Sequence, residues 1–167
     1  MDTIFCIVGP SGSGKTTLAK VLAAKGYNVI QSYTTRPRRT PDEWGHTFAE
    51  MFVDSGDVIA YNKFNDYEYW ATKAQYEGQG KSIYVIDPPG DKMLREAVDV
   101  PVVTIFLRAS DNTLLARMRC ERGDESAMKR WSHDIEVFAC VKADWVVDAD
   151  MRPDKIVEHV EGIIESY

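Results

Sequence analysis

The sequence predicts an α/β domain with three layers, α/β/α, in which helices cover both faces of a parallel core sheet. Three observations predict this fold class. Strand-like and helix-like hydrophobic patterns alternate along the 167 residues, and no internal repeat or low-complexity linker interrupts them. The run GPSGSGKT at residues 9–16 lies between the first strand pattern and the first helix pattern. A chain of this length suits one domain with one core.

Five short apolar runs predict the strands of the core sheet. Residues 3–8 (TIFCIV), 82–86 (SIYVI) and 102–107 (VVTIFL) are rich in β-branched side chains and lack polar alternation, which is typical of parallel strands buried on both faces. Residues 28–31 (NVIQ) and 145–147 (WVV) are shorter candidates.

Four segments carry apolar residues at helical spacing and are predicted helices. They are residues 15–25, which end before the helix stop Gly26, residues 112–121, residues 126–141, and a final helix that starts near Pro153. We interpret their apolar stripes as core contacts. The stripes comprise Leu18, Val21 and Leu22; Leu114, Leu115 and Met118; Met128, Trp131, Ile135 and Phe138; and Ile156, Val160, Ile163 and Ile164.

The spacing G-x-x-x-x-G-K-T is that of a phosphate-binding loop (P-loop), whose backbone N–H groups surround the phosphates of a nucleoside triphosphate. Lys15 is expected to reach the β- and γ-phosphates, and the Thr16 hydroxyl is the predicted Mg²⁺ ligand. A flexible glycine turn without a ligand is the alternative, but the flanking strand and helix favour the P-loop. The predicted triphosphate-binding residues here are Gly9, Ser11, Gly12, Ser13, Gly14, Lys15, Thr16 and Thr17.

Composition excludes several classes of protein. A net charge of −6 argues against a broad nucleic-acid-binding surface. No stretch approaches the apolar length of a membrane span, and the N-terminus lacks a signal-peptide pattern. The three cysteines have no metal-like spacing, so we expect reduced thiols. We therefore expect a cytoplasmic protein with no membrane or nucleic-acid partner.

Residues 33–81 break the alternation and are rich in Arg, Tyr, Trp, Asp and Gly, so we interpret them as a small inserted lobe for a second substrate. Within it Arg36, Arg38 and Arg39 place three guanidinium groups within four residues. Arginine suits phosphate because its planar fork donates two hydrogen bonds at once. A solvated basic loop is the alternative, and the nearby P-loop favours a second phosphate site.

These motifs together resemble the guanylate kinase family, and the resemblance spans nearly the whole chain. A P-loop alone occurs in many families, whereas a P-loop followed by TTRxxR at this separation is far more specific. The matching segments are residues 9–17, Ser32 through Arg39, Asp42 with Glu43, Gly45 and Phe48, residues 69–72, residues 87–90, and an arginine-rich lid at residues 117–130.

The resemblance implies ATP-dependent phosphoryl transfer, with Mg²⁺, to a nucleoside monophosphate, GMP or dGMP. It implies that Arg36, Arg39 and Tyr69 hold the acceptor's phosphate. Ser32 and Asp87 are implied near the acceptor base.

Other positions are less direct matches. Asp42 or Glu43 takes the place of a family acidic residue, and the choice stays open because the loop is two residues shorter here. His46 stands where the family has a phosphate-binding Tyr, and it is either a mobile loop residue or a phosphate contact. Asp148 stands at the family's adenine-side Asn and completes the predicted ATP site.

Two departures concern the base pocket. Ala60 aligns with the family's guanine-reading Glu, and Ala71 aligns with a Ser that assists at the guanine oxygen. Both changes remove polar groups, and buried hydrogen bonds can discriminate between substrates by about 10⁴ or more. We therefore expect relaxed base selectivity.

The lid supplies positive charge for the transferred phosphoryl group. Some of its arginines are expected to form surface pairs with Glu121, Asp124 or Glu125. The predicted catalytic set is Lys15, Arg36, Arg39, Arg117, Arg122 and Arg130. In this interpretation the chain is one domain, 1–167, with a core (1–31, 82–118 and 134–167), the inserted monophosphate-binding lobe (32–81) and the lid (119–133).

Two alternative functions remain open at this stage. One is a P-loop kinase for another nucleoside monophosphate or phosphorylated metabolite. The other is a guanylate-kinase-like binding module that has lost catalysis, against which the intact Lys15 and Thr16 argue. We expect a monomer or a weak homodimer.

Overall fold

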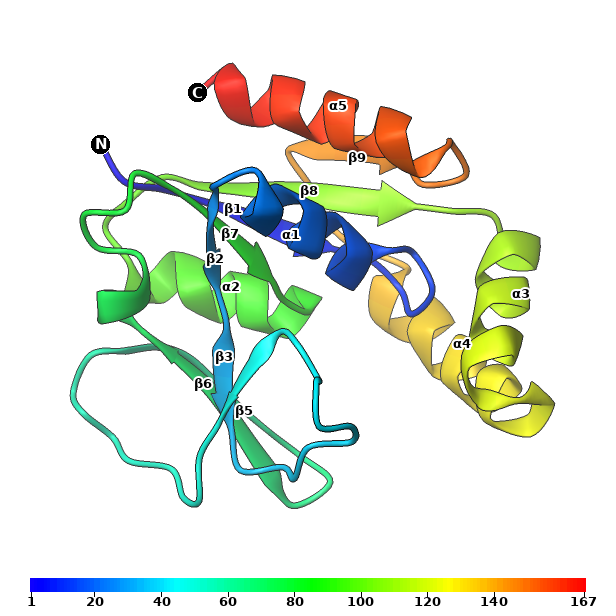
Figure 1. Cartoon of the computed structure of the whole chain (residues 1–167), viewed down its shortest axis with the longest axis horizontal. Helices are drawn as coiled ribbons and strands as arrows, with labels where there is room; N and C mark the ends of the chain where they lie inside the picture. Colours follow the sequence, from blue (N-terminus) through cyan, green and yellow to red (C-terminus); the bar gives the residue numbers. More distant parts are fainter.

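The computed structural model describes residues 1–167 and contains a five-stranded core sheet in the order β2-β7-β1-β8-β9 (Figure 1). Each neighbouring pair of these strands is parallel. The predicted α/β fold with a parallel core sheet is confirmed. The strands are β1 (Thr3–Val8), β2 (Asn28–Ile30), β7 (Lys81–Val85), β8 (Val102–Arg108) and β9 (Trp145–Asp148).

Helices cover both faces of this sheet. On one face, α1 (Lys15–Ala24) and α5 (Pro153–Glu165) share a core cluster with the odd-numbered β1 residues Phe5 and Ile7. On the other face, α2 (Pro88–Ala97) packs with the even-numbered residues Ile4, Cys6 and Val8. All six residues of β1 are buried, which is the reason why its sequence shows no polar alternation.

Two further helices form a hairpin beside the core sheet, at the right of Figure 1. They are α3 (Asp111–Arg122) and α4 (Asp124–Phe138), and they meet at Gly123, whose φ of 79° is in the left-handed region. Ser110 caps α3 by accepting a hydrogen bond from the Thr113 amide. The segment predicted as a lid therefore lies on this helical hairpin. None of the helices combines the length and the apolar composition that a membrane span requires.

Residues between β2 and β7 form a second sheet, in the order β4-β3-β6-β5, below the core sheet in Figure 1. The β3–β4 pair is parallel, whereas β6 is antiparallel to both β3 and β5. A 3₁₀ turn, η1 (Lys73–Gln75), leads back toward β7. The strands are β3 (Ser32–Thr34), β4 (His46–Phe48), β5 (Val58–Phe64) and β6 (Tyr67–Thr72).

The two sheets are joined through Gln31, the one residue between β2 and β3. Its carbonyl accepts a hydrogen bond from Gln75 Nε2 at 2.6 Å. Asn28 Nδ2 in turn donates to the Gln75 carbonyl at 2.8 Å. The outgoing and returning chain segments are thereby tied together where they leave the core.

The structure corrects two details of the predicted helical stripes. Val21 is 36% exposed, and in α1 the buried residues are Leu18, Ala19 and Leu22. In α4 the predicted stripe is offset by one position, since Met128 and Ile135 are exposed while Ala127 and Asp134 are buried. Helix α2 was not predicted, because Pro88, Pro89 and Gly90 read as a strand end.

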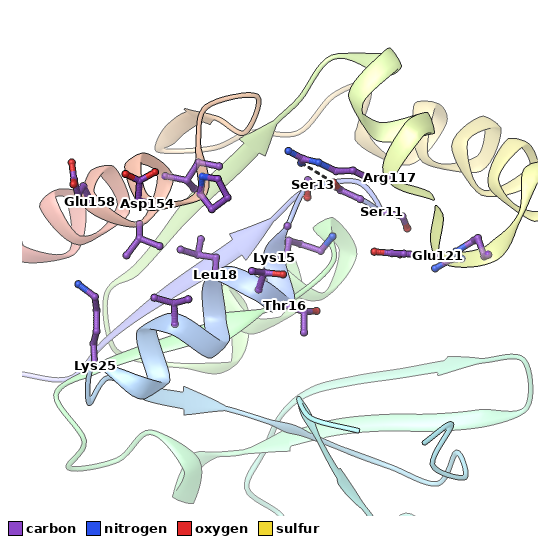
Figure 2. A pocket seen from close by; sticks show the side chains of 18 residues that line it. Ser11, Ser13, Lys15, Thr16, Leu18, Lys25, Arg117, Glu121, Asp154 and Glu158 are labelled. Atoms are coloured by element: carbon purple, nitrogen blue, oxygen red, sulfur yellow. Dashed lines mark hydrogen bonds between the residues drawn. The ribbon is translucent and has the colours of Figure 1, made fainter. Parts of the chain in front are cut away.

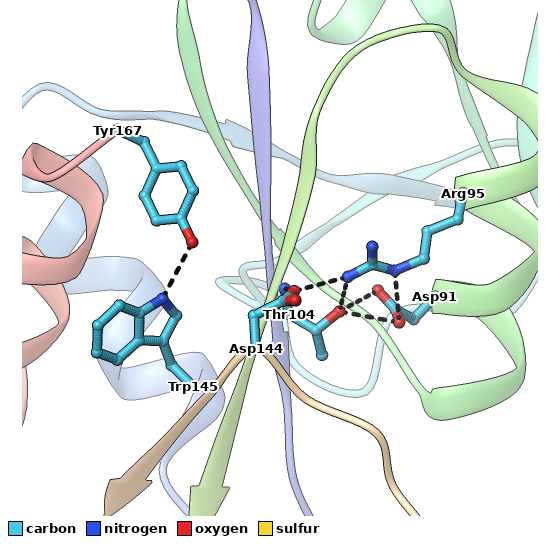
Figure 3. A network of polar contacts seen from close by, with 6 residues as sticks. All are labelled: Asp91, Arg95, Thr104, Asp144, Trp145 and Tyr167. Atoms are coloured by element: carbon cyan, nitrogen blue, oxygen red, sulfur yellow. Dashed lines mark hydrogen bonds and ion pairs between the residues drawn. The ribbon is translucent and has the colours of Figure 1, made fainter.

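A polar network fixes α2 against the core sheet (Figure 3). The buried Thr104 hydroxyl of β8 donates to Asp91 Oδ1 at 2.9 Å and accepts from Arg95 Nη2 at 2.6 Å. Arg95 also donates to Asp144 Oδ2 at 2.8 Å, and that carboxylate accepts from the Thr104 amide. Asp91 is only 8% exposed, and it accepts from the Thr104 hydroxyl and, at 3.4 Å, from Arg95 Nε, so the network satisfies a carboxylate that would be costly to leave unpaired.

We expect Thr104→Val to lower the free energy of unfolding by about 1 to 3 kcal/mol, since it keeps the side-chain shape but removes this donor. Thr104→Ser keeps the hydroxyl, so we expect a smaller decrease in the free energy of unfolding. Urea unfolding of both variants beside the wild type measures the difference. Equal stabilities of wild type and Thr104→Val would contradict this role for the network.

Candidate active site

The P-loop joins β1 to α1 and is shaped by its glycines. Gly12 and Gly14 adopt φ values of 81° and 93°, which other residues rarely adopt. A Cβ on Gly9 would lie 2.7 Å from Ser13 Oγ and 2.9 Å from the Leu107 carbonyl oxygen, so no side chain fits there. The loop therefore approaches β8 closely and opens directly into the N-terminus of α1.

Lys15 lies folded over this loop. Its Nζ donates to the carbonyls of Gly9 at 2.7 Å and of Pro10 at 2.9 Å. Burial lowers the pKa of Lys15 to about 8, although the nearby Asp134 carboxylate acts in the opposite direction. The buried Ser13 Oγ has no hydrogen-bond partner. An anion placed at this loop would give Lys15 a charged partner in place of two neutral carbonyls.

A cavity of about 690 Å³ extends from the P-loop to the groove between α1 and α5 (Figure 2). Its volume is in the range of roughly 300 to 1,000 Å³ that is usual for small-molecule sites. The Thr16 and Thr17 side chains are exposed beside the loop. The lining residues that matter for phosphate binding are Ser11 to Thr17 of the loop and Arg117, Glu121 and Arg122 of α3.

The three predicted lid arginines all approach the P-loop or its cavity. Arg117 donates to the carbonyls of Gly12 at 3.0 Å and of Ala149 at 3.1 Å. Arg130 Nε donates to Ser11 Oγ at 2.8 Å. Arg122 lines the cavity and has no hydrogen-bond or ion-pair partner. By contrast Arg119 pairs with Asp124 at 2.8 Å on the surface.

In the inserted lobe, Arg36 is already paired. Its guanidinium donates twice to Glu43, with Nη2–Oε1 at 2.5 Å and Nη1–Oε2 at 3.2 Å. The Arg39 amide also donates to Glu43 at 2.7 Å, whereas the exposed Arg39 guanidinium has no hydrogen-bond or ion-pair partner. The hydrogen bonds from Arg36 lower the pKa of Glu43 to about 2. Asp42 is exposed and makes no contact of this kind.

His46 and Tyr69 lie beside this pair. The His46 ring is 5.9 Å from the Tyr69 ring, edge to face, and its Nδ1 is buried with no partner. Burial, assisted by the Arg36 charge, lowers the pKa of His46, so its ring is neutral near pH 7. Ser32, opposite His46 in the β3–β4 pair, shares a hydrogen bond of 2.8 Å with the buried Tyr84 hydroxyl.

Comparisons with known proteins agree with this arrangement. A family model described as an AAA domain matches residues 5–139. The guanylate kinase of Chlamydia felis is 32% identical, over 88% of this chain and 80% of that protein. The guanylate kinase of Nitrobacter hamburgensis is 28% identical, over 98% of this chain and 82% of that protein. That of Chromohalobacter salexigens is 30% identical, and the match covers 75% of this chain but 64% of that protein.

The chain belongs to the guanylate kinase family. The family prediction and its enzyme class, nucleoside monophosphate kinase, are confirmed by these relatives. Among solved structures, the crystal structure of guanylate kinase from Anaplasma phagocytophilum is similar with a TM-score of 0.66. It is 16% identical over 99% of this chain and 85% of that chain, and it shows the fold alone.

The two positions where this guanylate kinase homologue departs from the family motif lie opposite each other. Ala60 and Ala71 are directly paired between β5 and β6. They are 6% and 0% exposed and belong to the core cluster that includes Tyr84. Methyl groups therefore form this part of the lobe's inner face, where the family motif has polar side chains.

Two predicted site residues have structural contacts of their own. Asp87 caps α2, with Oδ1 accepting from the Gly90 amide at 2.8 Å, and its side chain remains exposed. Asp148 is the last residue of β9, and its Oδ1 accepts from the Asp150 amide at 2.9 Å. Asp148 is not among the residues that line the P-loop cavity. Their predicted nucleotide contacts stay predictions.

One residue of the site was missed. Asp134 of α4 accepts a hydrogen bond from the Ser11 amide of the P-loop at 2.8 Å. The sequence analysis did not single it out, because the predicted α4 stripe placed Met128 and Ile135 inward and left Asp134 off that stripe. A helix register based on Ala127 would have placed Asp134 inward instead.

The Arg36–Glu43 pair leads to a stability prediction. We expect Glu43→Gln to lower the free energy of unfolding by about 1.5 to 3 kcal/mol at pH 7, and Asp42→Asn to change it by less than about 0.5 kcal/mol. The folded-state pKa of Glu43 lies below its unfolded value. The stability that ionised Glu43 contributes to the wild type is therefore complete above about pH 5 and is lost as the pH falls toward 2.

Chemical unfolding at several pH values measures this effect. The difference between wild type and Glu43→Gln should shrink in acid. A larger loss for Asp42→Asn than for Glu43→Gln would show that the family's acidic position is Asp42.

Proposed function

We propose that this protein transfers the γ-phosphoryl group of ATP to the phosphate of GMP or dGMP, giving the diphosphate and ADP, with relaxed base selectivity. The single observation that carries the proposal is that cationic side chains suited to phosphate lie in two separate parts of the structure. One is the P-loop with Lys15, and the other is the inserted lobe with Arg36 and the unpaired Arg39. We propose that it acts in the cytoplasm.

On the donor side, the P-loop amides and Lys15 bind the phosphates of ATP, while Arg117 and Arg122 contribute positive charge from α3. Mg²⁺, when bound with ATP, neutralises phosphate charge, and the exposed Thr16 hydroxyl would hold it. No group of three or more His, Cys, Asp or Glu residues is arranged to hold a metal ion. This fits a cation whose other ligands are phosphate oxygens and water.

On the acceptor side, Arg39 is free to pair with the incoming monophosphate. Arg36 is held in a fixed orientation by Glu43, which leaves its guanidinium pre-positioned at 9% side-chain exposure. The orphan Nδ1 of His46 offers a further hydrogen bond from a neutral ring. Phosphoryl transfer needs little covalent chemistry from the protein, so these groups act by alignment and by charge.

The residues around Ala60 and Ala71 support the proposed relaxed selectivity. Of the nearby polar residues in β5 and its turn, Tyr61 is paired with Trp70 and lies on the opposite face from Ala60. Asn65 and Asp66 have positive φ values and form the β5–β6 turn. Asn62 is paired with Tyr69 and therefore shares the face of Ala60 and Ala71. Asn62 is the residue best placed to replace a lost base contact.

A second candidate acceptor is another nucleoside monophosphate. It is favoured by Ala60 and Ala71, which stand where the family motif has the polar side chains that select guanine. Turnover separates the kinase from a binding module, which would bind nucleotides without producing ADP.

A coupled ADP-release assay with GMP, dGMP, AMP, dTMP and CMP tests the proposal. We expect GMP or dGMP to be the best acceptors and kcat/KM to favour guanine by less than about 10⁴, since each missing polar contact reduces discrimination by about ten- to hundredfold. Asn62→Ala should reduce the preference further.

Lys15→Ala serves as the inactive control for this assay. A guanine preference above about 10⁴ would contradict the relaxed pocket. No turnover of either guanine nucleotide would reject the proposed acceptor.

The two-site arrangement gives a separate prediction. We expect Arg39→Ala to raise the KM for the monophosphate by about ten- to hundredfold, because a charge-assisted contact is worth about 1.5 to 3 kcal/mol, and to leave the KM for ATP unchanged. Arg38→Ala is the matched control, since Arg38 stacks 4.2 Å from the Phe48 ring centroid and donates to the Glu43 carbonyl. Equal losses for ATP and monophosphate would reject separate sites.

A further inference from the structure

Asp134 is a buried carboxylate at the junction of the lid hairpin and the P-loop. It belongs to α4, its side chain is 3% exposed, and its Oδ2 accepts from the Ser11 amide at 2.8 Å. Ser11 and Asp134 are 123 residues apart in the sequence. A carboxylate from one end of the fold thus fixes a peptide group of the phosphate-binding loop.

The same carboxylate holds Arg130. Arg130 Nε is 3.2 Å from Asp134 Oδ1, one helical turn away, and it also donates to Ser11 Oγ at 2.8 Å. Ser11, Arg130 and Asp134 therefore form a closed triangle in which each residue contacts the other two. His133 Nδ1 also lies 3.4 Å from Asp134 Oδ1, but the His133 side chain is 55% exposed and contributes less to holding the carboxylate.

Packing alone does not account for an aspartate at this position. The neighbouring buried residue on the same helix face is Ala127, and an apolar side chain would fill the site without the cost of removing a charge from water. The two closest partners that offset this cost are the Ser11 amide at 2.8 Å and the Arg130 guanidinium at 3.2 Å. Both of these groups belong to the nucleotide-binding part of the molecule.

We propose that Asp134 is a positioning residue for phosphoryl transfer, which fixes the Ser11 amide in the P-loop and aims the Arg130 guanidinium at that loop. This inference rests on the proposed function. Without Asp134, Arg130 is free to adopt solvent-facing rotamers, and the Ser11 peptide loses the acceptor that holds its N–H in place. Preorganised charge and donors are the main source of catalysis in this chemistry.

Two substitutions separate the two contacts. Asp134→Asn keeps an oxygen that can accept from the Ser11 amide but removes the charge that holds Arg130. We expect kcat to fall about ten- to hundredfold with little change in the KM for ATP. Asp134→Ala removes both contacts, so ATP binding, measured by titration without any acceptor, should also weaken about three- to tenfold.

The matched control is Asp124→Asn, which removes the exposed carboxylate that pairs with Arg119 in the same hairpin. It should retain wild-type kcat and ATP affinity. A double-mutant cycle with Arg130→Ala gives the decisive readout, since Asp134→Asn should cause no further loss of kcat once Arg130 is absent. Circular dichroism and thermal unfolding check that each variant is folded, and the near-isosteric Asn keeps the test valid if the Ala variant does not fold.

Three results would overturn the proposal. The first is a wild-type kcat in Asp134→Asn, and the second is a loss of kcat from this substitution that is equally large with and without Arg130. The third is a lowered KM for ATP in Asp134→Asn, which would show that the carboxylate competes with the nucleotide. If the wild type turns over no monophosphate, the proposed function fails instead. The titration of ATP against Asp134→Ala then still tests the Ser11 contact.

Discussion

The burial of β1 on both faces is the constraint that places the active site. β1 is the central strand of the core sheet, between β7 and β8, and none of its side chains reaches solvent. The strand has no freedom to shift, because sliding by one residue would exchange the clusters that face α1 and α2. The P-loop therefore begins from a fixed point, and its glycine conformations, its contact with β8 and the start of α1 follow from that point.

Around the P-loop, most of the cationic side chains already have hydrogen-bond or ion-pair partners within the protein. Lys15 donates to loop carbonyls, Arg117 donates to two backbone carbonyls, and Arg130 is paired with Asp134. In the lobe, Arg36 is paired with Glu43. Of the arginines in the predicted catalytic set, Arg39 and Arg122 are the two whose guanidinium groups have no hydrogen-bond or ion-pair partner.

The sequence predicted those parts of the molecule whose local pattern is strong. The strands of the core sheet have β-branched runs, and α5 repeats Ile156, Val160 and Ile163 at helical spacing, so these elements could be located within one or two residues. The P-loop could be located because its chemistry requires fixed residue types at fixed spacing. Helix α2 was missed because it has few large apolar residues at helical spacing and its first turn contains two prolines and a glycine.

Contacts between distant segments could not be predicted. Asp134 reaches Ser11 only because the α3–α4 hairpin folds back onto the P-loop, and a one-residue error in the α4 register concealed it. The choice between Asp42 and Glu43 was open in the sequence, and the structure pairs Glu43 with Arg36. The sequence shows that Ala60 and Ala71 each replace a polar residue of the family motif. That the two alanines are directly paired could not be predicted, because it depends on the register of β5 and β6.

A single residue, Gln31, joins β2 of the core sheet to β3 of the lobe. The two sheets share no strand pair, so the chain connects them only at Gln31 and at the returning segment that contains η1. The Gln75 side chain forms hydrogen bonds to both connections, with the Gln31 carbonyl and with the Thr72 amide. A second contact lies farther out, where the Tyr61 amide donates to Met93 Sδ of α2 at 3.3 Å. β5 and β6 also pack against the core, since Ile59, Ala60 and Ala71 share a buried cluster with Tyr84 and Leu94. A rotation of the lobe about the Gln31 link would therefore have to separate these apolar side chains, so the packed boundary and not the link alone holds the lobe in place.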